Sequence, residues 1–145
     1  MTHEDAGHYA AKHSPDTRLD PKIAEAIKKK ISDGKIPCAA VHKIAHELDV
    51  SPNSVGVAID LLEARISLCQ LGLYGYSPEK GIVKPAESVS QELEEAIRNS
   101  LVNNRLSCLS SWEIASQLRI PKMNVAAACE TLKIKISNCQ LGSFR

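Results

Sequence analysis

The residues best suited to chemistry in this chain are its cysteines, four of which form two similar pairs. Cys38 and Cys69 are separated by the same number of residues as Cys108 and Cys139. Two thiols brought together could form a redox switch or supply thiolate ligands to a metal, although no CxxC spacing supports a metal site. The alternative is that they are small apolar residues at a sheet edge, because unpaired cysteine is among the most buried residue types.

Two histidines extend this candidate site. Cys38, His42 and His46 follow one another at helical spacing, and two histidines one turn apart can bind a metal ion. However, the apolar residues Val41 and Ile44 define the inward face of the same helix, which directs both histidines toward solvent. The sequence therefore predicts no cofactor, and the cysteines and histidines remain a redox or metal hypothesis.

An internal repeat determines how these residues are organised. Residues 23–72 align without a gap on residues 93–142, and 16 of the 50 aligned positions are identical. The match is densest at its end, where both copies read Cys-Gln-Leu-Gly. The period of 70 residues exceeds that of a solenoid repeat, about 20–50 residues. The sequence therefore predicts two copies of one small domain.

Each copy is expected to contain three helices, a short extended segment and a hairpin. Capping residues, apolar periodicity and glycines place these elements, the first hairpin being expected over 66–76. Expected helices cover about 20–33, 38–48 and 52–62 in the first copy, and 90–102, 108–118 and 121–133 in the second. The predicted organisation is a flexible polar tail over 1–19, a domain over 20–77, a linker over 78–89 and a domain over 90–145.

A helix–turn–helix pattern lies in the middle of each copy. In the first copy, Ala45 is small where two helices would cross, Val50 fills the gap beneath the turn, and Val55 buries the second helix. The second copy has Ala115, Ile120 and Val125 at these positions. The pattern resembles the helix–turn–helix of winged-helix transcriptional regulators. This resemblance implies a mainly α fold with short β-hairpins, built as two tandem winged-helix domains of three helices plus a wing.

The resemblance also implies a function, namely binding of double-stranded DNA by a transcription regulator or accessory factor. In such domains the third helix enters the major groove and its first side chains read the bases. Carried over to this chain, the third helix and the following strand supply the DNA-binding residues Pro52, Asn53, Ser54, Gly56, Lys122, Met123, Asn124, Ala127, Lys133 and Lys135. The third helix of the first copy has no lysine or arginine, so the second copy is expected to bind more strongly.

Composition leaves other classes of function open. A formal charge of +1 argues against a dedicated polybasic binder, and an odd number of cysteines without an apolar leader favours a cytoplasmic protein. No catalytic motif or membrane-spanning stretch is present, so neither an enzyme nor a membrane partner is expected. The alternatives are a winged-helix adaptor with a protein partner, an RNA-hairpin binder, and a thiol- or metal-responsive protein. A homodimer is compatible with each of them.

Overall fold

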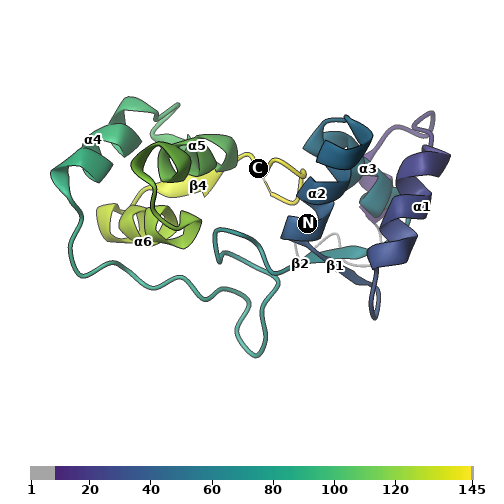
Figure 1. Cartoon of the computed structure of the whole chain (residues 1–145), viewed down its shortest axis with the longest axis horizontal. Coiled ribbons are helices and arrows are strands. Elements are labelled where there is room, and N and C mark those ends of the chain that lie inside the picture. The colour runs from purple at the N-terminus through teal and green to yellow at the C-terminus, as the bar shows by residue number, and fades with distance from the viewer. Residues whose placement is uncertain (1–8, 145) are drawn as a thin grey trace. The chain divides into compact units, whose positions relative to one another are not determined.

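The computed structural model describes residues 9–144, and its first half contains three helices and two short strands. After the 3₁₀ helix η2 (Tyr9–Lys12), these elements are α1 (Pro21–Lys30), β1 (Lys35–Pro37), α2 (Cys38–Leu48), α3 (Pro52–Leu61) and β2 (Arg65–Ser67). The second half repeats them as α4 (Gln91–Asn99), β3 (Arg105–Ser107), α5 (Cys108–Leu118), α6 (Lys122–Leu132) and β4 (Lys135–Ser137). The same order is visible in Figure 1. The chain is therefore mainly helical with short strands, as predicted.

Local capping explains where several helices begin. The Asp20 carboxylate accepts the Lys22 amide at 2.8 Å before α1, and the Ser51 hydroxyl accepts the Ser54 amide at 3.1 Å before α3. Such caps satisfy amides that the first helical turn leaves without an intrahelical partner. The turns that end α2 and α5 use left-handed residues at equivalent positions, Asp49 at φ 53° and Arg119 at φ 57°. The helix–turn–helix pattern thus produces the same local geometry twice.

The strands pair in parallel, and no returning strand follows β2, which contradicts the hairpin predicted over 66–76. Lys35 of β1 lies opposite Arg65 of β2, and Arg105 of β3 lies opposite Lys135 of β4. None of residues 68–90, all of which are described, lies in a strand. Each sheet therefore closes over two intervening helices, as a parallel pair requires. The winged-helix prediction fails at the wing itself, and the small two-stranded sheet takes its place.

Each half has its own aliphatic core. In the first half the fully buried side chains include Ile27, Ile36 and Ile59, which come from a helix, a strand and a second helix. In the second half Ile97 and Leu106 occupy the positions equivalent to Ile27 and Ile36. In each half, all three helices pack against one another beside the sheet. No helix within the described residues is long and apolar enough to cross a membrane.

The chain divides into two compact units, and their boundaries differ from the predicted domains. Unit 1 contains the described residues up to Cys69 together with Gln140–Phe144, whereas unit 2 contains Gln70–Cys139. Residues 70–77 were expected in the first domain and residues 140–144 in the second. Each unit is therefore completed by a segment that follows the strand of the other repeat.

Candidate nucleic-acid interface

The predicted DNA-reading residues of unit 1 lie on the first turns of α3. Asn53 and Ser54 are exposed and Pro52 is half-buried, so these three can reach a ligand. Gly56 is buried, and a Cβ atom added there would collide with the carbonyl oxygen of Leu141. The expectation for Gly56 is therefore corrected: the segment Gln140–Phe144 covers this part of α3.

The corresponding residues of unit 2 are divided in the same way. Asn124 is exposed, and Met123 retains 36% of its exposure. Lys122 is half-buried, because its ammonium group lies 4.5 Å from the centre of the Trp112 ring in a cation–π contact. The Ala127 carbonyl accepts the Ala86 amide at 3.1 Å, so residues of the predicted linker cover that side of α6. Ala127 is half-buried, like Pro52 in unit 1.

Lys135 belongs to a pair of cations at the start of the sheet in unit 2. It is the register partner of Arg105, and both side chains are exposed. Adjacent strands are about 4.8 Å apart, so two like charges stand side by side at this edge. Lys133 is also exposed and lies two residues before Lys135, at the C-cap of α6.

Unit 1 has the same arrangement. Lys35 and Arg65 are register partners at the start of β1 and β2, and both are exposed. We refer to Lys35 with Arg65, and to Arg105 with Lys135, as the cation pairs. Within residues 9–144, none of these four side chains takes part in an ion pair. Two adjacent like charges weaken a sheet unless an anion compensates them.

Sequence reasoning identified Lys135 but missed the other three members of the cation pairs. The signal was present in the repeat alignment, where Lys35 corresponds to Arg105 and Arg65 to Lys135. Positive charge is thus kept at both positions, although only 16 of the 50 aligned positions are identical. The parallel register that places residue 35 beside residue 65 is needed to turn this signal into a pair of adjacent charges.

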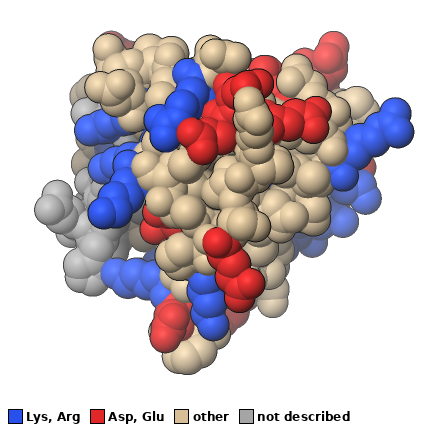
Figure 2. Space-filling model, turned by 90° about the vertical axis from the view of Figure 1, so that its left-hand side faces the viewer, with Lys and Arg blue, Asp and Glu red and all other residues tan. Residues whose placement is uncertain are grey.

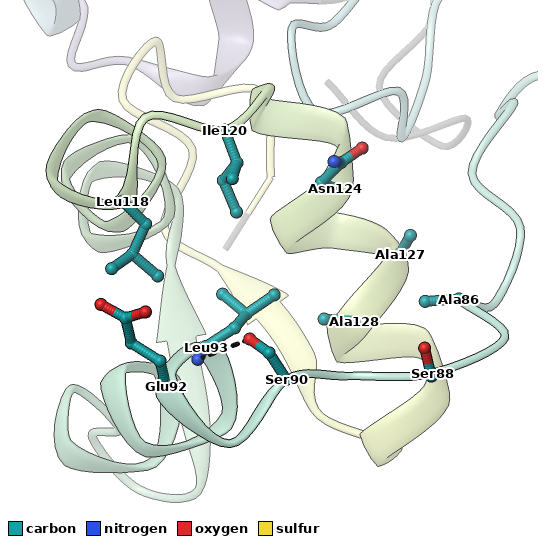
Figure 3. Close-up of a pocket in the computed structure, with 10 residues that line it drawn as sticks. All are labelled: Ala86, Ser88, Ser90, Glu92, Leu93, Leu118, Ile120, Asn124, Ala127 and Ala128. Atoms are coloured by element: carbon teal, nitrogen blue, oxygen red, sulfur yellow. Dashed lines mark hydrogen bonds between the residues drawn. The ribbon is translucent and has the colours of Figure 1, made fainter.

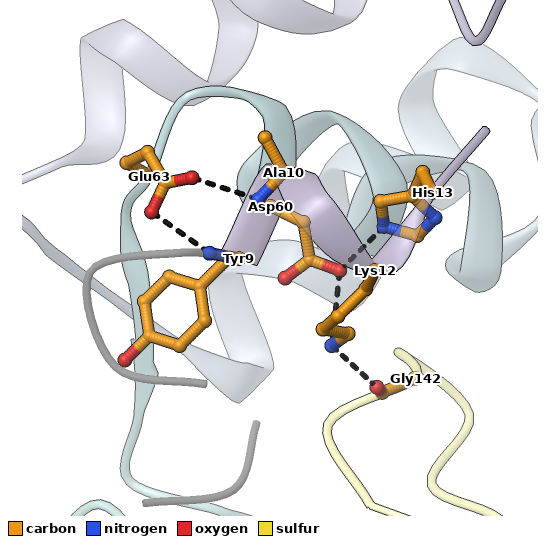
Figure 4. Close-up of polar contacts among 7 residues, drawn as sticks. All are labelled: Tyr9, Ala10, Lys12, His13, Asp60, Glu63 and Gly142. Atoms are coloured by element: carbon orange, nitrogen blue, oxygen red, sulfur yellow. Dashed lines mark hydrogen bonds and ion pairs between the residues drawn. The ribbon is translucent and has the colours of Figure 1, made fainter. Parts of the chain in front are cut away.

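The N-terminal segment of unit 1 packs on α3, which differs from the expected flexible tail. Tyr9 is only 4% exposed, and the Glu63 carboxylate accepts the backbone amides of Tyr9 at 2.9 Å and Ala10 at 2.7 Å. Asp60, itself buried, contacts Lys12 at 3.2 Å and His13 at 2.8 Å (Figure 4). Asp60 at the end of α3 and Glu63 just after it are therefore engaged by this segment. Residues 1–8 of the predicted tail lie outside the described residues.

The cysteine pairs do not form disulfides. Cys38, Cys69 and Cys108 are buried and Cys139 is half-buried, which disfavours the exposed sulfur that a redox sensor needs. Cys38 and Cys108 are the first residues of the equivalent helices α2 and α5. Cys69 and Cys139 follow β2 and β4, the strands that pair with β1 and β3.

The histidines do not complete a metal site with these thiols. His42 is half-buried and His46 is exposed. In the described part of the chain, no three side chains of His, Cys, Asp or Glu are placed to hold a metal ion. The metal hypothesis for the cysteines and histidines thus has no geometric support.

Cys129 belongs to the core of unit 2. It is 1% exposed on α6, and its burial, reinforced by the charge of Glu130, raises the pKa of the thiol to about 11. Because the thiolate is the reactive form of cysteine, this side chain is inert near neutral pH.

An open pocket of about 410 Å³ lies within unit 2 (Figure 3). Leu93, Leu118 and Ile120 form part of its apolar wall, and Ser90 and Asn124 contribute polar groups. The Ser90 hydroxyl is already engaged with the Leu93 amide at 3.2 Å. The pocket contains no lysine or arginine, so it offers no charge for a phosphate.

Charges of both signs are mixed over the face of the molecule shown in Figure 2. This agrees with the formal net charge of +1 and shows that this face carries no continuous basic surface. Positive charge is instead concentrated locally, as in the cation pairs.

Comparison of the chain with protein-family models, curated proteins and solved structures finds no match.

Proposed function

We propose that this chain binds double-stranded DNA, as a transcription regulator or accessory factor, and contacts its phosphates through the two cation pairs. The observation that carries the proposal is the occurrence of two exposed, adjacent cations without ion-pair partners among the described residues, at the same place in both units. Phosphate contacts from lysine and arginine supply most of the affinity of proteins for DNA that does not depend on sequence. Two equivalent sites on one chain suit a polymer with a repeating charge.

Neighbouring charges support the same location. In unit 1, α1 ends with the exposed residues Lys28, Lys29 and Lys30 shortly before β1, although Lys29 also contacts Glu25 at 3.5 Å. In unit 2, Lys133 adds a cation close to its pair. Exposed Asn53 and Asn124 are candidates for base contacts, because amide side chains can bond to base edges.

The proposal is tested by reversing the charge of each cation pair. Arg105→Glu with Lys135→Glu, and separately Lys35→Glu with Arg65→Glu, should weaken binding to duplex DNA at least ~10-fold, because each double variant replaces two phosphate-contacting cations with anions. Each double variant should also reduce the salt dependence by about 2 in logarithmic slope. Fluorescence anisotropy with a labelled duplex over a series of salt concentrations measures both quantities.

A matched control changes the same total charge elsewhere. Lys22 and Lys84 are exposed and lie outside both cation pairs, so Lys22→Glu with Lys84→Glu should leave most of the affinity and salt slope intact. Equal losses in the control and the pair variants would reject the cation pairs as the binding site. Tighter binding to an RNA hairpin than to duplex DNA would favour the RNA alternative. Failure to bind either nucleic acid would favour the protein adaptor.

A further inference from the structure

The division between the two units falls at the same position of both repeats. Unit 1 gives way to unit 2 between Cys69 and Gln70, and unit 2 gives way to unit 1 between Cys139 and Gln140. These positions correspond in the repeat alignment. The Cys-Gln-Leu-Gly sequence therefore marks the point at which the chain leaves one unit for the other. We call Gln140–Phe144 the closing segment of unit 1.

The closing segment is seated closely on α3. Leu141 is 2% exposed and Ser143 is 3% exposed. The absence of a side chain at Gly56 lets the Leu141 backbone approach the helix, since a Cβ atom there would overlap the carbonyl. A Cβ atom on Gly142 would lie 3.4 Å from the side-chain oxygen of Asn53. Gly56 thus forms a notch that accepts the closing segment.

Lys12 also binds the closing segment. Its ammonium group donates to the Gly142 carbonyl at 3.2 Å and contacts the buried carboxylate of Asp60 at 3.2 Å (Figure 4). A single lysine therefore joins the segment to α3, although residues 12 and 142 are 130 positions apart in the chain.

Unit 2 is completed in an equivalent way by the residues that follow β2. Leu71, the counterpart of Leu141, is fully buried. A Cβ atom on Gly72 would lie 3.4 Å from the sulfur of Met123, and these two residues correspond to Gly142 and Asn53. Unit 2 thus also receives the Leu-Gly of the other repeat, but its counterpart of Gly56 is Ala126, so the notch belongs to unit 1 alone.

We infer that the notch at Gly56 is an interaction site for a second copy of this chain, whose closing segment replaces the segment of the same copy. The contacts made in the notch are identical whichever copy supplies the segment, so the exchange involves little loss of contact energy. Leu68 and its counterpart Asn138 precede the two crossing points in a left-handed conformation, with φ 49° and φ 52°. A change of φ and ψ at such a position redirects the chain that follows.

The test uses the full-length protein at increasing concentration. Sedimentation equilibrium should reveal a dimer whose fraction rises with concentration, particularly after refolding from denaturant at high concentration. In a sample that mixes a ¹³C-labelled with an unlabelled copy, isotope-filtered NMR should detect contacts between α3 of one copy and Leu141 of the other. A protein that stays monomeric throughout, or a dimer without these intermolecular contacts, would overturn the inference.

A single methyl group provides the matched variants. Gly56→Ala fills the notch and should abolish the dimer. Gly34→Ala adds a methyl group where no atom lies within 4 Å, and its φ of +73° makes the variant a control for general destabilisation. Gly34→Ala should dimerise like the original chain, and a Gly56→Ala variant that dimerises equally well would contradict the inference. The mixed-label measurement needs no variant, so it decides the matter even if Gly56→Ala folds poorly.

Discussion

The two units share one fold but use the end of their third helix differently. In unit 1, Asp60 is buried and Glu63 accepts two amides of the N-terminal segment. Their counterparts in unit 2 are Glu130 and Lys133, both exposed. Asp60 of α3 and Glu63 just after it thus attach a neighbouring segment, whereas Lys133 after α6 adds a positive charge at the position of Glu63.

This difference shows how two copies of a domain can diverge without a change of fold. The core positions and the cation pairs are shared, because they determine the sheet and its charged edge. The outer face of the third helix does not contribute to the sheet, and in each unit a different segment packs on it. In unit 2 that segment is the predicted linker, where the Thr131 hydroxyl donates to the Ala86 carbonyl at 2.7 Å.

The first prediction separates the buried acid of unit 1 from its exposed counterpart. Asp60→Asn should lower the free energy of unfolding by about 1.5–3 kcal/mol, because hydrogen bonds to charged groups contribute that much. Glu130→Gln should change it by less than about 0.5 kcal/mol, as is usual for exposed positions. Urea unfolding of both variants measures the difference. Equal effects would show that the contacts of Lys12 and His13 with Asp60 do not distinguish the units.

A second prediction concerns one core position, which holds Ile59 in unit 1 and Cys129 in unit 2. Burial raises the pKa of Cys129 from 9.0 to about 11, so the folded state holds this proton more tightly than the unfolded chain. Stability from this group is complete below pH 9 and is lost as the pH rises to 11. Unfolding measured across this range should show a decline that is reduced in Cys129→Val. Parallel curves for the two proteins would refute the assignment.

The third prediction addresses a smaller contact that only unit 2 has. Lys122 lies over Trp112, whereas the equivalent residues of unit 1 are Pro52 and His42. Lys122→Met keeps the apolar stem but removes the charge, and should cost about 0.5–1 kcal/mol of stability. The same substitution in a Trp112→Leu background should cost less. A double-mutant cycle from thermal or urea unfolding tests this, and a coupling energy of zero would show that the contact is not stabilising.

The helices could be predicted because their signals are local. The expected ranges 38–48 and 108–118 agree with α2 and α5, since apolar spacing and the preceding extended residues fix both ends. The strand partners were not predictable in this way. Gly72 and Gly75 suggested a hairpin, yet residues 68–90 contain no strand, and the parallel register of β2 with β1 across two helices is not specified by a strand sequence alone.

The candidate site was predicted only in part, for the same physical reason. The exposure of Asn53 and Asn124 follows from their place in the helix–turn–helix pattern. The burial of Gly56 depends on Leu141, which is far away in sequence and is positioned by the packing of the whole unit. The cation pairs require the parallel register as well as the repeat alignment, so neither sequence periodicity nor composition reveals them alone.

The inclusion of Gln140–Phe144 in unit 1 has a consequence for synthesis on the ribosome. Unit 1 contains β2 and the helices before it, but the notch at Gly56 stays empty until residues 140–144 have been translated and released from the exit tunnel. Completing unit 1 therefore requires contacts of very large sequence separation, which slow folding. During this interval the nascent chain exposes an incomplete apolar surface, a condition that favours association with chaperones or with neighbouring nascent chains.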